Sequence, residues 1–162
     1  MLNLKIQTYF KFILTISLIS LISAYYIEYI LGHQPCNLCL IERIPYVISI
    51  FLICISLILK KIEKFFVLLL IIIFFISVLI SFYHFGIEQG LFNESAICGL
   101  EGSKEIITKE EILKQLSEKT ISCKDVTFRI FGFSLTSINI VLNLFLIVLL
   151  LNILKNYEKF KT

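Results

Sequence analysis

The chain has 162 residues, of which 58% are hydrophobic and 17% are charged. A typical soluble domain has about 45–50% apolar and about 25% charged residues, so this composition argues against a water-soluble globule and favours a membrane protein. The formal net charge of +3 is small and unevenly distributed along the chain, and therefore indicates membrane orientation and not nucleic-acid binding.

Four long apolar segments each approach the length that crosses a hydrocarbon core: residues 12–31, 44–59, 65–85 and 133–154. We expect helices, because an isolated strand cannot satisfy its backbone hydrogen bonds in lipid. The second segment is short, and its helix can begin near Leu38 or Leu40 if Arg43 lies at the interface or faces a partner inside the bundle. The sequence therefore predicts an all-α fold, an integral membrane four-helix bundle in which residues 1–162 form one domain.

The first segment follows Lys5 and Lys11, as the apolar core of a signal peptide would. Its apolar stretch is longer than that of a usual signal peptide, and Ile22-Ser23-Ala24 is a poor cleavage site. We therefore expect this segment to be a membrane helix.

Basic residues indicate which side each connection faces. Lysines gather before the first segment, between the second and third, and after the fourth: Lys5, Lys11, Lys60, Lys61, Lys64, Lys155, Lys159 and Lys161. The opposite connections are the loops at about 32–43 and 86–132, and the longer loop holds six basic and eight acidic residues. By the positive-inside rule, we expect both termini in the cytoplasm and both loops outside.

Four of the five cysteines fall in these outward loops. Cys36 and Cys39 form a CxxC motif in the first loop, and Cys98 and Cys123 lie 25 residues apart in the second. Paired cysteines in an oxidising compartment form and exchange disulfides, whereas a cytoplasmic CxxC is more easily interpreted as a metal site. Cys54 lies about 22 Å from Cys39 along a continuous helix, and we expect it to be a small buried apolar residue.

The CxxC motif precedes a helix and is followed by Arg43. A positive helix end and a nearby cation both lower the pKa of a thiol, so the motif predicts a reactive thiolate. A static disulfide and a zinc site are the alternatives. Zinc would need two further nitrogen or sulfur ligands, from His33, His84 or the cysteines of the long loop.

The pair in the long loop could equally be a permanent crosslink, which would contribute about 3.5 kcal/mol in the chain-entropy model. Between its cysteines, Thr108 and Glu111 form a capping box that predicts a short helix at about 109–119. Its apolar residues share one face, so this helix could lie on the outer membrane surface.

In their order along the chain, these features resemble the DsbB-type disulfide bond formation proteins. The resemblance covers nearly the whole chain: four spans, CxxC with Arg43 four residues after its second cysteine, and a second pair in the long outward loop. It extends to two further stretches, Tyr83-His84-Phe85-Gly86-Ile87-Glu88 and Phe131-Gly132-Phe133-Ser134. The resemblance implies a thiol oxidoreductase of the bacterial inner membrane that reoxidises a soluble periplasmic DsbA-like thioredoxin-fold protein and passes the electrons to the membrane quinone pool.

The family likeness also implies roles for individual residues. The partner's thiolate would attack Cys98, and the released Cys123 would attack the Cys36–Cys39 disulfide. The residues expected beside the quinone are Cys39, Arg43 and His84. Ubiquinone is favoured over menaquinone, and no metal is expected. The carboxylates Glu28 and Glu88 are candidates to pair with Arg43 or to transfer protons, or they simply reach water.

Two other functions are compatible with parts of the pattern. Vitamin K epoxide reductases also carry CxxC and loop cysteines, but their active CxxC lies in the last helices, whereas here it follows the first span. A membrane scaffold or metal-binding protein with static disulfides would form no mixed disulfide with a soluble partner and would not respond to quinone.

Overall fold

A computed structural model of the chain describes residues 2–58, 63–93, 98, 122–124, 128–130 and 132–157. The helices in these ranges are α1 (Leu2–Tyr29), α2 (Asn37–Ile41), α3 (Ile44–Ile58), α4 (Glu63–Glu88) and α6 (Leu135–Lys155). Four stretches are long and apolar enough to cross a membrane: Ile6–Tyr29, Asn37–Ile58, Glu63–Glu88 and Leu135–Lys155. The predicted all-α membrane bundle is therefore confirmed, while the loop helix expected at about 109–119 lies outside the described residues.

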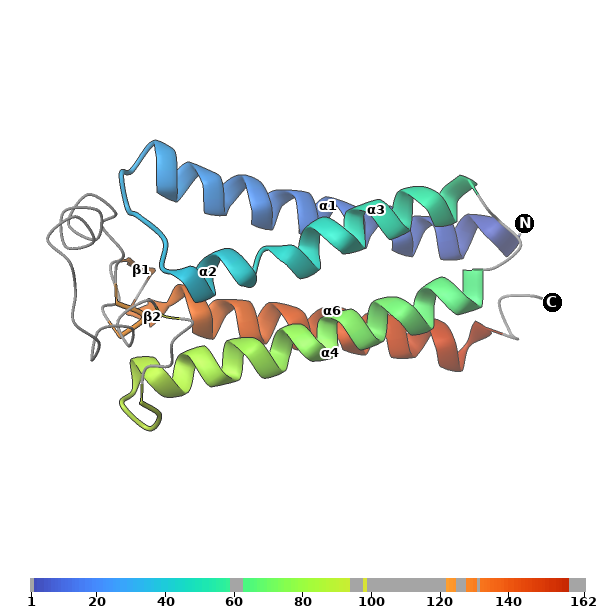
Figure 1. Ribbon diagram of the computed structural model, residues 1–162. Helices are drawn as coiled ribbons and strands as arrows, with labels where there is room; N and C mark the ends of the chain where they lie inside the picture. Colours follow the sequence, from blue (N-terminus) through green and yellow to red (C-terminus); the bar gives the residue numbers. More distant parts are fainter. Residues whose placement is uncertain are drawn as a thin grey trace, which may run out of the picture.

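The helices run alongside one another, α1 next to α3 and α4 next to α6 (Figure 1). Helix α1 begins and α6 ends at the same end of the bundle, and α2 lies at the opposite end. There the strands β1 (Arg129–Ile130) and β2 (Phe133–Ser134) form an antiparallel pair in which Arg129 lies opposite Ser134. Phe133 and Ser134 thus belong to this hairpin, and α6 begins at Leu135 with Ser134 as its N-cap.

Helices α2 and α3 form one span with a break at Glu42 and Arg43. Pro45 explains the break, since it lacks a backbone N–H and its ring clashes with the carbonyl four residues earlier, that of Ile41. The Arg43 N–H bonds instead to the carbonyl of Leu40, three residues back. Two charged residues therefore lie where the helix changes course.

The apolar core lies between the four long helices and, except for Tyr46, in the half of the bundle away from α2. Its members recur at helical spacing, as in Ile6, Phe10 and Ile13 of α1. The other buried members come from α3, α4 and α6: Tyr46, Ile53, Val67, Leu70, Phe74, Leu146, Leu150 and Ile153. Large apolar side chains also cover the outside of the same helices, among them Phe51 and Val141, each 67% exposed. Helices that are apolar on all sides are suited to lipid.

Small polar side chains join the helices in the interior. Ser49 on α3 donates to Ser17 on α1 at 3.4 Å, and Asn143 on α6 donates through Nδ2 to Ser77 on α4 at 3.0 Å. All four side chains are buried. Such polar contacts hold helices together in hydrocarbon, because no water is present there to replace the hydrogen bonds between them.

We expect Asn143→Ala to lower the free energy of unfolding by about 0.6 kcal/mol and by no more than about 1.7 kcal/mol, the range of interhelical hydrogen bonds in membranes. The measurement is a denaturation titration in mixed micelles. Asn152→Ala is the matched control, because Asn152 lies exposed on the same helix. Equal losses in both variants would contradict a role for the bond to Ser77.

Candidate functional site

The CxxC motif forms the first turn of α2. Cys36 is the N-cap, with extended backbone angles (φ −74°, ψ 167°), and its Sγ accepts a hydrogen bond from the Cys39 N–H at 3.3 Å. An N-cap side chain thereby satisfies an N–H group that has no partner within the helix. The same turn places the two Sγ atoms 2.6 Å apart. The motif is thus folded so that its two sulfurs face each other.

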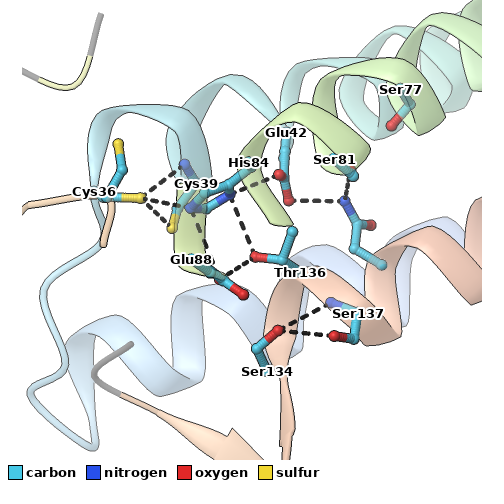
Figure 2. Close-up of polar contacts among 12 residues, drawn as sticks. Cys36, Cys39, Glu42, Ser77, Ser81, His84, Glu88, Ser134, Thr136 and Ser137 are labelled. Carbon is cyan, nitrogen blue, oxygen red and sulfur yellow. Dashed lines mark hydrogen bonds and ion pairs between the residues drawn. The ribbon is translucent and has the colours of Figure 1, made fainter. Parts of the chain in front are cut away.

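Cys36 is the more enclosed of the two cysteines and contacts a histidine from another helix. Its Sγ lies 3.5 Å from Nε2 of His84, near the end of α4 (Figure 2). The hydrogen bond from Cys39 lowers the pKa of Cys36 to about 5; burial opposes this shift, and the hydrogen bond with His84 supports it. The lowered pKa favours the thiolate form of Cys36 at neutral pH when the pair is reduced. Arg43, which we expected to lower the pKa of a thiol in the motif, instead pairs with Glu28.

His84 lies within a buried polar cluster that joins three helices. Its Nδ1 lies 2.8 Å from Oε1 of Glu42, and the other carboxylate oxygen of Glu42 accepts from Asn139 Nδ2 at 2.9 Å. Thr136 on α6 donates to Glu88 at 2.6 Å, and its oxygen lies 3.3 Å from His84 Nδ1. Figure 2 shows Glu42, Glu88 and Thr136 around the ring. The ring is thus held through both of its nitrogens.

Arg43 points to the other side of the span. Its guanidinium pairs with Glu28 on α1 and lies over the ring of Tyr25, with 4.9 Å from Cζ to the ring centroid. Side-chain exposure is 13% for Arg43 and 19% for Glu28. Of the partners considered for Arg43 from the sequence, the structure selects Glu28. A charged pair close to the apolar span is thereby neutralised.

The second cysteine pair is a disulfide, Cys98–Cys123. Both cysteines are buried, and they belong with Cys36, Leu38 and Ile87 to a single apolar cluster. The long loop thus brings its disulfide against the first cysteine of the CxxC motif. All four loop cysteines lie together at one end of the bundle.

A cavity of about 520 Å³ lies beside this cluster, a volume in the range of small-molecule sites. One wall comes from α1 and is mostly apolar, with Ile16, Ile19, Ala24 and Ile27 beside Ser20 and Ser23. The rest of the lining includes the functional groups: Cys36, Cys39, Glu42, Arg43, His84, Glu88 and Cys123. The cavity therefore joins an apolar surface to thiols, a guanidinium and an imidazole.

Cys36, Cys39 and His84 also form a group that could hold a metal ion, with their ligand atoms within 4.8 Å of one another. The sulfur spacing argues against zinc. Two Zn–S bonds of about 2.3 Å at a tetrahedral angle place their sulfurs about 3.8 Å apart, whereas these sulfurs are 2.6 Å apart. The geometry fits a pair that closes a disulfide better than a zinc site.

The residues singled out from the sequence lie at this end of the bundle, with one correction. Cys54, expected to be buried, is exposed on α3, because the neighbouring helices pack against the face that carries Ser49, Ile53 and Ser56. Sequence reasoning also missed a set of polar residues around His84: Glu42, Ser81, Thr136 and Asn139. The sequence pattern that could have identified them is the presence of polar residues at helical spacing inside apolar spans.

Comparison with known proteins agrees with this arrangement. The family model for disulfide bond formation protein DsbB matches residues 7–153. The chain is 35% identical over 140 residues to the uncharacterized protein RP370 of Rickettsia prowazekii (strain Madrid E), a match that covers 85% of this chain and 81% of the relative. No solved structure matches the chain significantly. With four apolar helices, a CxxC pair and a second cysteine pair packed against it, the chain belongs to the DsbB family of disulfide bond formation proteins.

Proposed function

We propose that the protein reoxidises a soluble DsbA-like thioredoxin-fold protein by disulfide exchange and passes the electrons to a membrane quinone, so that exported proteins can form disulfides. The observation that carries this proposal is the packing of the Cys98–Cys123 disulfide against Cys36 beside a cavity that also contains Arg43. The bundle would lie in the bacterial inner membrane. Both termini would be cytoplasmic, because the lysines gather at that end of the helices.

The relay consists of balanced thiol–disulfide exchanges. The partner's thiolate attacks Cys98, forms a mixed disulfide and releases Cys123 as a thiolate. Cys123 attacks Cys36, so a Cys123–Cys36 bond forms and Cys39 leaves as a thiolate. The partner's second thiol then resolves the mixed disulfide and frees Cys98. Attack of Cys98 on Cys123 restores the loop disulfide and releases Cys36, which closes again on Cys39 as two electrons leave.

The cavity supports quinone as the electron acceptor. A bound quinone would supply the chemistry of a two-electron, two-proton acceptor. The apolar wall from α1 suits a ring with a hydrocarbon tail, and Cys39 and Arg43 line the same cavity. The Arg43 guanidinium keeps its proton and so stabilises negative charge developing near Cys39.

The burial of Cys98 adds a requirement to the first step. Its exposed fraction is 0%, and that of Cys123 is 2%. A partner's thiolate must approach in line with the disulfide it attacks. The loop disulfide therefore has to leave its cluster with Leu38 and Ile87 before the partner reacts.

We expect Cys36→Ser, Cys39→Ser, Cys98→Ser and Cys123→Ser each to abolish quinone-dependent oxidation of a reduced thioredoxin-fold partner, because every exchange needs its sulfur. Turnover is measured with the purified protein, using ubiquinone and menaquinone analogues in parallel. Cys54→Ser is the matched control and should keep full activity, since Cys54 is exposed on α3 away from the cluster. A Cys98→Ser protein that turned over normally would rule out the relay.

We expect Arg43→Gln to lower kcat/KM for quinone by about a hundredfold, the usual effect of removing a group that stabilises developing negative charge. Arg43→Lys should lose less, because it retains a point charge but not the planar guanidinium. As a control, the single oxidation of the partner without quinone should proceed at the normal rate in both variants. A loss confined to that quinone-free step would place Arg43 outside the quinone site.

A further inference from the structure

Glu42 is a buried carboxylate to which the relay assigns no step. It is 8% exposed and belongs to a span that is apolar enough to cross a membrane. A carboxylate in such a place is costly unless it is well partnered, and it therefore suggests a function. Its two oxygens reach His84 and Asn139, on two different helices.

The contacts around His84 identify which ring nitrogen carries a proton. The Thr136 hydroxyl donates its hydrogen to Glu88, so its oxygen can only accept from Nδ1 of His84, 3.3 Å away. The Glu42 oxygen on the same nitrogen, at 2.8 Å, is also an acceptor. Nδ1 therefore bears a hydrogen. Nε2 faces the Cys36 sulfur and carries either a lone pair, when the ring is neutral, or a proton taken from the Cys36 thiol.

Residue 42 must accept hydrogen bonds from two donors, one on Asn139 and one on His84, and only a carboxylate has an acceptor oxygen for each. Asn139 presents Nδ2 to Glu42, because its Oδ1 accepts from Tyr46 and from Asn143. One oxygen of Glu42 must therefore accept from Asn139 and the other from His84. A glutamine has a single acceptor oxygen, so one of the two donors would face another N–H.

We propose that Glu42 is a positioning residue that holds the His84 ring with Nε2 toward Cys36, so that the ring carries the Cys36 proton while Cys36 acts as leaving group and nucleophile. This inference rests on the proposed disulfide exchange. In the step concerned, the Cys98 thiolate attacks Cys123, the Cys98–Cys123 bond forms and the Cys123–Cys36 bond breaks. Cys36 leaves as a thiolate paired with the protonated ring, whose charge the Glu42 carboxylate balances.

The other groups near Cys36 are compatible with this role. Cys39 of α2 contacts its sulfur directly, and Cys123 of the loop packs in the same cluster. Glu88 of α4 lies 3.9 Å from His84 Nε2, beyond hydrogen-bond distance, and Arg43 is engaged by Glu28. The low pKa of Cys36, to which the His84 hydrogen bond contributes, agrees with an ion pair.

The test is the rate of iodoacetamide alkylation at Cys36 in the reduced protein, resolved by peptide mass spectrometry from about pH 4 to about pH 9. In the unsubstituted protein the rate should fall only as the pH drops through about 5. Glu42→Gln should slow alkylation at neutral pH by about tenfold or more and move the midpoint toward that of an ordinary thiol. Glu42→Asp, which keeps the charge and both acceptors, should recover part of the rate.

Glu88→Gln is the matched control, because it also removes a buried carboxylate near the ring but does not contact Nδ1. It should slow Cys36 less than Glu42→Gln does. Equal effects of the two variants, or no effect of Glu42→Gln, would overturn the proposal. The assay contains neither quinone nor partner, so a failure here is distinct from a failure of the relay.

A second measurement needs no change at Glu42. The chain has two histidines, so a His33→Phe variant leaves the His84 ring as a single set of ¹⁵N signals. We expect Nδ1 to be protonated at neutral pH, and Nε2 also to carry a proton when the pair is reduced, as the ion pair with Cys36 requires. A ring protonated at Nε2 and bare at Nδ1 would overturn the proposed arrangement.

Discussion

Hydrocarbon supplies no hydrogen bonds, and this constraint shapes the interior of the bundle. The buried Glu42 can exist there only with partners from the protein itself, and it finds them in His84 of α4 and Asn139 of α6. Asn139 in turn donates to Ser81 at 2.8 Å. Because these contacts join the α2–α3 span to α4 and α6, they favour one rotation of each helix about its axis. The polar cluster thus sets the position of His84 beside Cys36.

The break between α2 and α3 separates two neighbouring charges. Glu42 and Arg43 are adjacent in sequence, yet one joins the polar cluster of α4 and α6 and the other pairs with Glu28 of α1. Both still line the same cavity. A negative group therefore supports the histidine on one side of the CxxC motif, while a positive group faces the cavity on the other. Pro45, by preventing a regular helix through this region, makes the separation possible.

The two cysteine pairs are held by different means. The CxxC sulfurs meet through the local geometry of an N-cap and the first turn of α2. The loop disulfide meets Cys36 only because Leu38 and Ile87 form an apolar surface on which it packs. The turn that holds the CxxC sulfurs is rigid, whereas the loop disulfide can leave the apolar surface and pack on it again. This difference suits the proposed relay, in which one pair would stay in the membrane domain and the other would reach a soluble partner.

The sequence by itself determined the four membrane helices, the CxxC pair at a helix start and a second cysteine pair, since apolar length and residue spacing are local properties. Through the family resemblance, it also singled out Arg43 and His84. Only the tertiary structure decided that Glu42 supports His84 and that Asn139, 97 residues further on, completes the contact. It likewise placed Cys54 on the exposed face of α3. Those outcomes depend on how each helix is rotated against its neighbours, and the rotation follows from packing and polar pairing between segments far apart in the chain.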